Sequence, residues 1–346
     1  MGKELELLQI ISVTMIVLLC ILFLYLVGRK YLENKQNDMV QKREQQLTKP
    51  IFLYLQFDKE LELELDESKV DKLALENILS HYSEVIEGEQ EENRLHSLAN
   101  TYLKNHYLKE LRARNWSRRM NVLYKIEDFH LIELEKALVE MIHLKRDISL
   151  EEKVQIYRVL SSFQNEQIFL LLNHDEELTE KDYRSMLLRL EADPFYALLS
   201  SFPSCREPLQ LAILDVISLR GKIDHTAFLE QVFQSNQGEI RLRALKAISS
   251  IGFVQSIQTY LPLAESPSWQ ERMMIAKLLG KRKDLSYIPF LREFMHDNSW
   301  WVRSQAAESI MYYKNGKEVL QEILDYSEDM FAKDMALEWI NKGVIQ

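Results

Sequence analysis

Glycine and proline are scarce in this chain, and cysteine is nearly absent. The 346 residues include 9 Gly, 7 Pro and 2 Cys. So few turn-forming residues argue against a β-sandwich or barrel, which needs many tight turns. Cys20 and Cys205 lie far apart and form no CxxC or Cys/His cluster, which argues against a disulfide-stapled fold or a zinc site. Good helix formers such as Glu, Leu, Lys and Gln abound, so an all-α fold is predicted.

The chain also has no excess of positive charge. The net charge is −10, and residues 58–92 alone account for it with thirteen Asp or Glu against three Lys. Nucleic-acid binding needs a basic face, so no nucleic-acid partner is expected.

Motifs of enzyme chemistry are absent as well. The chain has no Gly-rich phosphate loop, HExxH or GxSxG sequence. We therefore expect no enzyme activity, no catalytic residue, no cofactor and no metal.

One long apolar run stands near the N-terminus. Residues 10–27 carry no charge, and about 20 such residues at 1.5 Å each cross a hydrocarbon core of about 30 Å. We expect residues 1–28 to form a transmembrane anchor that contacts the bilayer through residues 8–27. A cleaved signal peptide and a buried core helix are the alternatives, but the run lacks an A-x-A cleavage site and is apolar all round.

Basic residues are concentrated on the C-terminal side of this run. They are Arg29, Lys30, Lys35, Lys42, Arg43 and Lys49. The positive-inside tendency predicts a single-pass protein of the cell membrane, with its N-terminus outside and its C-terminal part in the cytoplasm.

The next two segments are less regular. Residues 29–49 predict a polar juxtamembrane helix or linker, with a break at residues 48–50, where Thr48 would cap a helix whose first turn holds Pro50. Residues 50–109 predict a helical segment with the acidic stretch. Its alternation ELELEL at 60–65 fits a strand, a helix or an extended loop.

A repeat with a fixed interval governs the C-terminal half. Its first column is polar and consists of Gln210, Arg241, Arg272 and Arg303, which recur at equal intervals along the sequence. We call this column the polar ladder. Three apolar columns follow at offsets of 3, 4 and 7, the spacing of one helix face. They are Ile213, Ala244, Ile275 and Ala306; Leu214, Leu245, Ala276 and Ala307; and Ile217, Ile248, Leu279 and Ile310.

Other columns complete the unit as helix, turn, helix. Ser204, Ser235, Ser266 and Asp297 mark helix starts, and Gly221 and Gly252 mark turns. The second helix has the columns Leu229, Tyr260 and Leu291, and Val232, Leu263 and Phe294. An earlier copy begins at Asn115, and a last one has Ala336, Leu337 and Ile340 after Lys333. We expect the ladder to bond turn groups of neighbouring repeats.

The segments WWVRSQAAESI and EIRLRALKAISSIG resemble HEAT repeats of the short variety shared with phycobilin lyases. The resemblance covers about residues 110–346 and implies a HEAT-like α-solenoid of stacked helical hairpins. With the anchor, the layout is similar to bacterial membrane-tethered HEAT-repeat proteins. The His-Glu pairs of the HEAT-type iron hydroxylases are absent, because no histidine here is followed by Glu.

A binding scaffold is the expected function. We expect protein partners, themselves membrane-associated, in an envelope or polysaccharide-synthesis assembly. An accessory regulatory subunit of one membrane enzyme is the alternative, and a HEAT-type enzyme is a third possibility.

Of the adjacent tryptophans Trp300 and Trp301, one is expected to pack and the other to be partly exposed. The expected partner-binding surface lies on the concave helices and comprises Leu242, Arg243, Lys246, Met273, Met274, Lys277 and Trp300.

Overall fold

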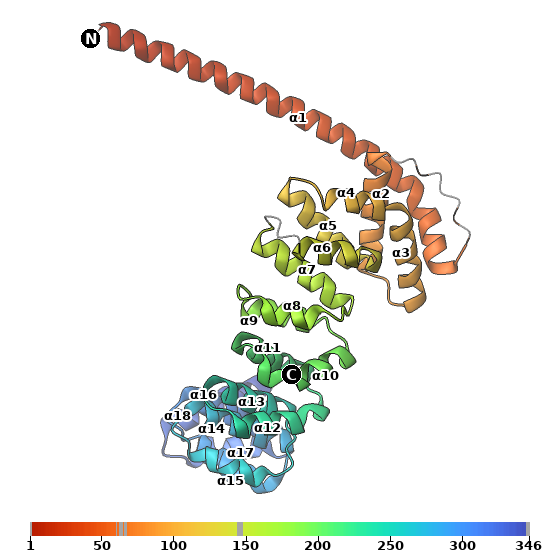
Figure 1. The fold of residues 1–346 in the computed structure, drawn as a ribbon. Coiled ribbons are helices and arrows are strands. Elements are labelled where there is room, and N and C mark those ends of the chain that lie inside the picture. The colour runs from red at the N-terminus through yellow and green to blue at the C-terminus, as the bar shows by residue number, and fades with distance from the viewer. Residues whose placement is uncertain (1, 60, 62–64, 66–67, 144–147, 344–346) are drawn as a thin grey trace. The chain divides into compact units, whose positions relative to one another are not determined.

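The computed structural model describes residues 2–59, 61, 65, 68–143 and 148–343. Helices and the turns between them make up this described part, which contains no strand. The predicted all-α class is thus confirmed. The chain divides into two compact units, Met1–Phe163 and Gln164–Gln346 (Figure 1).

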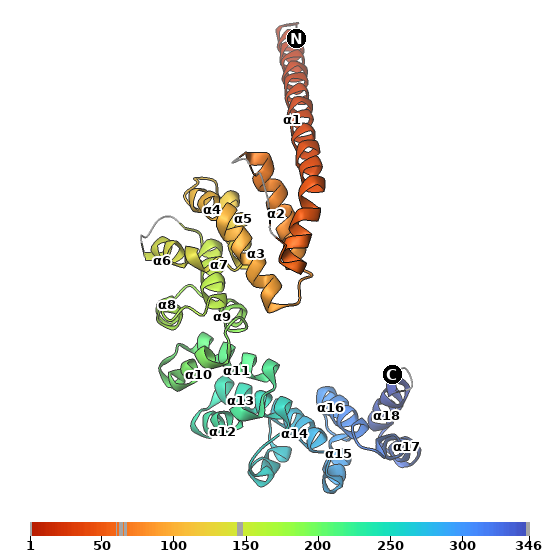
Figure 2. The same cartoon turned by 90° about the vertical axis from the view of Figure 1, so that its right-hand side faces the viewer.

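The N-terminal unit is dominated by one very long helix. Its elements are α1 (Gly2–Phe57), α2 (Lys69–Ser83), α3 (Glu89–Tyr102), α4 (Lys104–Glu110), α5 (Trp116–Asp128), η1 (Ile132–Leu134), α6 (Glu135–His143) and α7 (Leu150–Ser162). The first part of α1 projects away from the rest of this unit (Figures 1 and 2). It is long and apolar enough to cross a membrane, and every side chain from Val13 to Val27 is exposed.

The last part of α1 belongs to the core of this unit. Val40, Leu47, Ile51 and Leu55 are buried, on the side that packs against α2 and α3. Arg94 donates to the Leu55 carbonyl at 2.7 Å, which satisfies one of the open carbonyls at the end of α1. The apolar segment and the core of the unit are therefore joined by one uninterrupted helix.

The predicted break at residues 48–50 is wrong, because α1 continues through Pro50. Proline removes one backbone hydrogen bond of a helix. The Thr48 hydroxyl bonds back to the Glu44 carbonyl at 2.7 Å instead of capping a new helix. Ile51 directly after the proline is fully buried, so packing offsets the lost bond.

The alternation at 60–65 lies mostly outside the described residues. Of its members, Leu61 and Leu65 are described, and neither has regular secondary structure.

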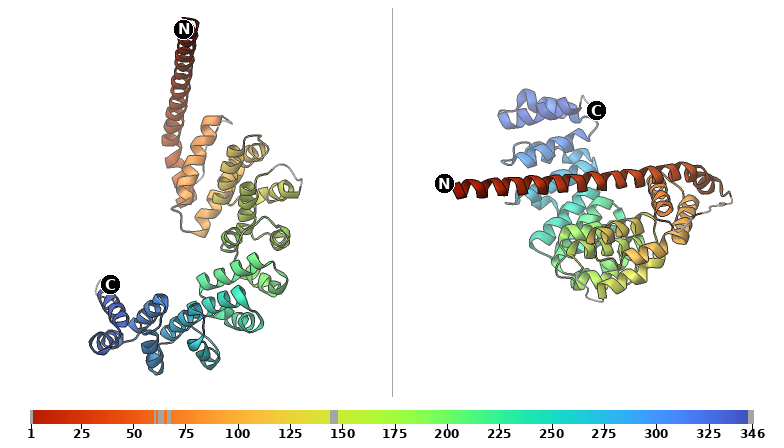
Figure 3. Two further views of the ribbon diagram at one scale, coloured as in Figure 1. Left: turned by 90° about the vertical axis from the view of Figure 1, so that its left-hand side faces the viewer. Right: turned by 90° about the horizontal axis from the view of Figure 1, so that it is seen from above.

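The C-terminal unit is a row of helical pairs. Its elements are α8 (Ile168–His174), α9 (Glu180–Leu187), α10 (Ala192–Ser200), η2 (Phe202–Ser204), α11 (Glu207–Arg220), η3 (Ile223–His225), α12 (Thr226–Ser235), α13 (Gly238–Ile251), η4 (Ile257–Thr259), η5 (Leu261–Glu265), α14 (Trp269–Arg282), η6 (Leu285–Tyr287), α15 (Ile288–Phe294), α16 (Trp300–Met311), α17 (Gly316–Tyr326) and α18 (Met330–Gly343). Within this unit the pairs stack side by side along a curve (Figure 3). In Figure 2, α13, α14, α16 and α18 lie on its inner side, and α12, α15 and α17 on its outer side.

The predicted repeat register is confirmed by burial. All twelve residues of the three apolar columns have 0% of their surface exposed. The N-cap positions Arg206, Gln237, Ser268 and Ser299 recur at the same interval as the columns, so equivalent helices start in register. The Ser/Asp column lies two positions before these caps. There Ser266 and Asp297 accept the backbone N–H two positions on, and they tighten the turn instead of capping the helix.

The turns follow the predicted glycine column. Gly221 and Gly252 have positive φ angles of 62° and 80° and end α11 and α13 in the left-handed conformation. Lys283, one repeat later, adopts φ 54° at the end of α14.

Two parts of the predicted repeat differ. Between Gly252 and Ser266 the second helix is replaced by the short 3-10 turns η4 and η5, with Pro262 in the middle, where an α-helix would lose a backbone donor. In the last unit Ala336 and Ile340 are buried, whereas Leu337 is 45% exposed. The corresponding residues of the earlier repeats, Leu214, Leu245, Ala276 and Ala307, are fully buried. No described element covers Leu337 to the same extent.

Candidate functional site

The polar ladder holds repeats together. Arg272 donates to the Ser266 carbonyl of its own turn at 2.7 Å and to the Asp297 carboxylate of the next turn at 2.6 and 2.9 Å. Arg303 bonds the Asp297 carbonyl at 2.7 Å, and Arg241 pairs with Glu271 in the next repeat. The prediction that the ladder bonds turn groups of neighbouring repeats is confirmed for Arg272.

The earlier copy in the N-terminal unit repeats this arrangement. Arg119 donates to the Ala113 carbonyl at 2.8 Å and to both oxygens of Glu152 at 2.5 and 2.9 Å. These guanidinium groups are occupied by structural bonds, so we exclude them from the candidate surface.

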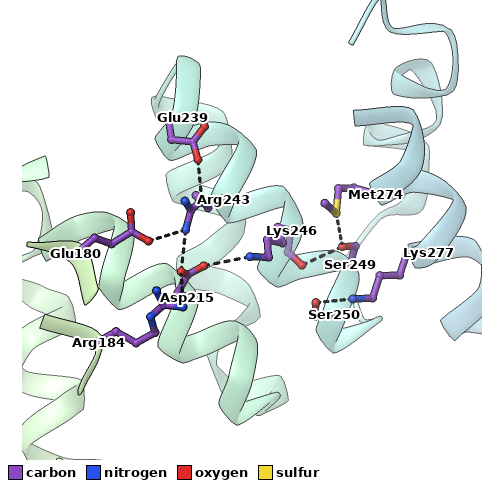
Figure 4. Close-up of polar contacts among 10 residues, drawn as sticks. All are labelled: Glu180, Arg184, Asp215, Glu239, Arg243, Lys246, Ser249, Ser250, Met274 and Lys277. Atoms are coloured by element: carbon purple, nitrogen blue, oxygen red, sulfur yellow. Dashed lines mark hydrogen bonds and ion pairs between the residues drawn. The ribbon is translucent and has the colours of Figure 1, made fainter. Parts of the chain in front are cut away.

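The inner helices carry a second, more exposed set of charges, centred on Asp215 (Figure 4). Asp215 is buried in α11 and accepts from Arg243 at 2.7 Å and from Lys246 at 3.3 Å, both in α13. Burial alone would raise the pKa of this carboxyl, but the hydrogen bond from Arg243 and the charge of Lys246 outweigh it and hold the pKa below its ordinary value.

Arg243 is the most heavily bonded residue of the predicted surface. Besides Asp215, it donates to Glu239 at 2.6 Å and to Glu180 of α9 at 2.9 Å. Burial would lower its pKa, but these carboxylates raise it. Arg243 is therefore a structural link between α9, α11 and α13, and its replacement would disturb the array itself.

Three lysines form the accessible positive charge of the inner face. Lys246 remains 44% exposed in spite of its bond to Asp215. Lys277 of α14 is half-buried and donates to the Ser250 hydroxyl at 3.0 Å, and Lys281 is exposed. Burial lowers the pKa of Lys277, with further lowering by the charges of Lys281 and Lys246, although Glu308 opposes it. The charges of Lys246 and Lys281 thus both act unfavourably on the ammonium of Lys277, and an anion bound beside Lys277 would relieve that repulsion.

The apolar residues of the predicted surface have different environments. Leu242 and Met273 are half-buried. Met274 is buried, and its sulfur accepts the Ser249 hydroxyl at 3.3 Å (Figure 4). The expectation that Met274 would be apolar surface is wrong, because α13 of the preceding repeat covers this side of α14.

Aromatic side chains extend this surface at the starts of α14 and α16. Trp300 and Trp301 are 47% and 57% exposed, so the prediction that one of them packs is wrong. Their rings meet edge to face at a centroid distance of 4.9 Å, and Trp301 stacks with Trp269 at 6.3 Å. The rings cover each other and leave their outer faces to solvent.

Sequence reasoning missed Trp269 as a member of this surface, although Trp269 precedes Trp300 by one repeat length. It did place Asp215 on this face, in the same column as Lys246 and Lys277, but did not predict that Asp215 is the centre of the charged array. What could not be read from the columns was which side chains bond to one another.

Comparison with known families agrees with this geometry. The model of HEAT repeats matches residues 226–311 and, in a second overlapping placement, residues 257–338. Residues 226–338 are HEAT repeats. No curated protein matches the chain. The inner helices α13, α14 and α16 of the HEAT array therefore carry the candidate site, with the lysine row and the tryptophans as its accessible parts.

Proposed function

We propose that this chain is a non-enzymatic, membrane-anchored scaffold whose HEAT array binds an acidic, amphipathic segment of a membrane-associated protein. The observation that carries the proposal is the row Lys246, Lys277 and Lys281 on α13 and α14, together with the exposed Trp301 on the adjacent inner helix α16. HEAT repeats commonly mediate protein–protein interactions, in keeping with such a role.

The chemistry of this surface supports an acidic, amphipathic partner. Half-buried Leu242 and Met273 offer apolar contact, and tryptophan is enriched among residues that dominate binding energy. Methionine adapts its flexible side chain to irregular partners. Carboxylates of the partner would neutralise the lysine row and set the orientation of the segment.

The anchor is proposed from the exposed apolar part of α1. No described part of the chain covers the side chains from Val13 to Val27, and a helix of this composition is stable in a hydrocarbon layer. The basic residues that follow it favour a cytoplasmic HEAT array. Tethering would raise the effective concentration of the array near partners in the same membrane.

Site-specific photocrosslinking in intact membranes tests the proposal. A photoreactive residue in place of Trp301 should yield a crosslinked partner whose linked peptide is acidic and amphipathic. The same residue in place of Tyr326, which is 83% exposed at the end of α17, is the control and should not. Lys281→Glu should abolish the crosslink at residue 301, whereas Lys317→Glu on the outer helix α17 should leave it unchanged. An equal yield at both positions, or a basic linked peptide, would refute this docking surface.

The mass of the crosslinked complex separates the two forms of the proposal. An envelope or polysaccharide-synthesis assembly predicts several partners in one large complex after mild detergent extraction. An accessory regulatory subunit predicts one membrane enzyme in a complex of simple stoichiometry.

A further inference from the structure

The N-terminal unit contains a cavity that the scaffold role does not use. It has a volume of about 440 Å³ and lies between the start of α2, the end of α3 and α4. Small-molecule sites have volumes of about 300 to 1,000 Å³, so the space is large enough for a ligand. Its wall includes Lys72, Lys109 and Arg112.

Among the described residues that line this cavity, cations outnumber acids. Asp71 is the one acidic residue among the described residues of its lining, and it accepts from Arg43 at 2.8 and 3.4 Å. In the part of the chain that the structure describes, neither Lys109 nor Arg112 has a carboxylate within ion-pair distance. Within the described ranges, Lys109 and Arg112 are thus two neighbouring cations to which no carboxylate is bonded.

Neutral hydrogen-bonding groups stand beside these cations. Thr101, Asn105 and His106 also line the cavity. Burial lowers the pKa of His106, and the charges of Lys72, Arg118 and Lys109 lower it further although Glu110 opposes them. The imidazole is therefore neutral near pH 7 and has one nitrogen that donates and one that accepts.

From this arrangement we infer that the cavity binds a small phosphate-bearing anion. The guanidinium fork of Arg112 and the ammonium of Lys109 match the charge and the several acceptor oxygens of a phosphate group. The amide of Asn105 adds donors for the remaining oxygens, whereas the Thr101 hydroxyl already donates to the Ser97 carbonyl at 2.8 Å. Because Asp71 is already bonded to Arg43, no carboxylate of the described lining competes with the ligand for Lys109 and Arg112.

The position of the cavity along α1 favours a soluble ligand over a lipid headgroup. Arg43 bonds Asp71 at the cavity wall, and Val27 ends the apolar run earlier in the same helix. At 1.5 Å per residue, about 24 Å of helix separates these two positions, which is more than a headgroup layer spans. This choice of source rests on the proposed membrane anchor, whereas the anion site itself does not.

Calorimetric titration of the full chain with inorganic pyrophosphate tests the site. In zwitterionic detergent we expect saturable binding that Lys109→Gln combined with Arg112→Gln weakens at least about tenfold. Both side chains are exposed, so the fold should tolerate the change, and circular dichroism checks this. Arg114→Gln is the matched control, because Arg114 is exposed and close in sequence but does not line the cavity. Binding that stays unsaturated up to about 10 mM, or equal weakening in the control, overturns the inference.

A second arm identifies the source of the phosphate. The chain is placed in nanodiscs of either zwitterionic or phosphate-rich anionic lipid, and pyrophosphate is titrated into both. Equal affinities support a soluble ligand. Competition by the anionic lipid would keep the anion site and overturn the assignment to a soluble molecule. Failure of the chain to enter nanodiscs would contradict the membrane anchor and leave the detergent titration valid.

Discussion

Arg272 and Asp297 are joined across a repeat boundary by two parallel hydrogen bonds, from Nε to Oδ2 at 2.6 Å and from Nη2 to Oδ1 at 2.9 Å. The side chains are only 18% and 9% exposed. Asp297 also accepts the backbone N–H of Ser299 at 2.7 Å. One carboxylate thus couples a turn, the helix that follows it and the preceding repeat.

Replacing this carboxylate should destabilise the array. Asp297→Asn should lower the free energy of unfolding by about 2 kcal/mol, because it removes charge-assisted bonds to Arg272. Urea denaturation of the detergent-solubilised chain, followed by circular dichroism, measures the change. Asp334→Asn at an exposed position is the control and should cost under about 0.5 kcal/mol. Equal effects of the two substitutions would contradict the inter-repeat role.

The same carboxylate predicts a pH dependence. Burial would raise the pKa of Asp297, but the bonds from Arg272 and Ser299 hold it below the ordinary value of 3.8. A depressed folded-state pKa stabilises the protein above the unfolded pKa, and the contribution is lost as the pH falls through the folded pKa. The stability difference between wild type and Asp297→Asn should therefore be full above pH about 4 and shrink below it. A difference that is constant with pH would show that the bond contributes no charge-dependent stability.

The buried columns predict that substitutions at buried and at exposed positions differ sharply in their effect on stability. Ala307 is fully buried where α16 meets its neighbours. Ala307→Asp should cost about 3 to 5 kcal/mol, since an unpaired carboxylate would be buried there. Lys317→Ala on the exposed side of α17 should cost under about 0.5 kcal/mol. Thermal unfolding of both variants checks this, and a similar loss in both would mean that the repeat register is wrong.

The two turn glycines should differ although both have positive φ. A Cβ on Gly221 would meet no atom within 4 Å, whereas one on Gly252 would lie 2.5 Å from the Lys281 Cβ. Gly221→Ala should cost about 1 kcal/mol for the left-handed backbone alone. Gly252→Ala should cost about 1 to 3 kcal/mol more, because α14 must shift. Equal stabilities of the two variants in urea denaturation would show that the repeats accommodate the methyl group without strain.

Topology is tested by reporters at the C-terminus. If the basic residues after the apolar run lie in the cytoplasm, a green fluorescent protein fused after Gln346 should fluoresce and an alkaline phosphatase fusion should be inactive. A fusion to residues 1–49, which keep these basic residues, should report the same orientation. An active phosphatase after Gln346 would reverse the proposed orientation or indicate export.

The helical repeat was predictable because it depends on the local spacing of apolar residues. The columns led by Ile213, Leu214 and Ile217 recur at one fixed interval, and a stripe at helical spacing must be buried in any helix that folds stably in water. Gly221 and Gly252 indicated the positions of the turns for a similar reason, since a left-handed helix cap favours glycine whatever packs nearby. The apolar run of α1 was equally plain from composition and length.

The candidate site depended instead on which neighbours cover each helix. A helical pattern divides a helix into faces, but it does not show that α13 buries Met274 or that Arg243 reaches Glu180, 63 residues earlier in the chain. Nor does it show that Trp301 contacts both Trp269 and Trp300 while Trp300 and Trp301 stay exposed. Packing also decided the backbone conformation at Pro50. Local rules predict that the helix breaks there, but the burial of Ile51 and Leu55 keeps α1 intact. Local spacing thus determined the elements and their buried stripes, and packing between distant segments decided which charges and rings remain available to a partner.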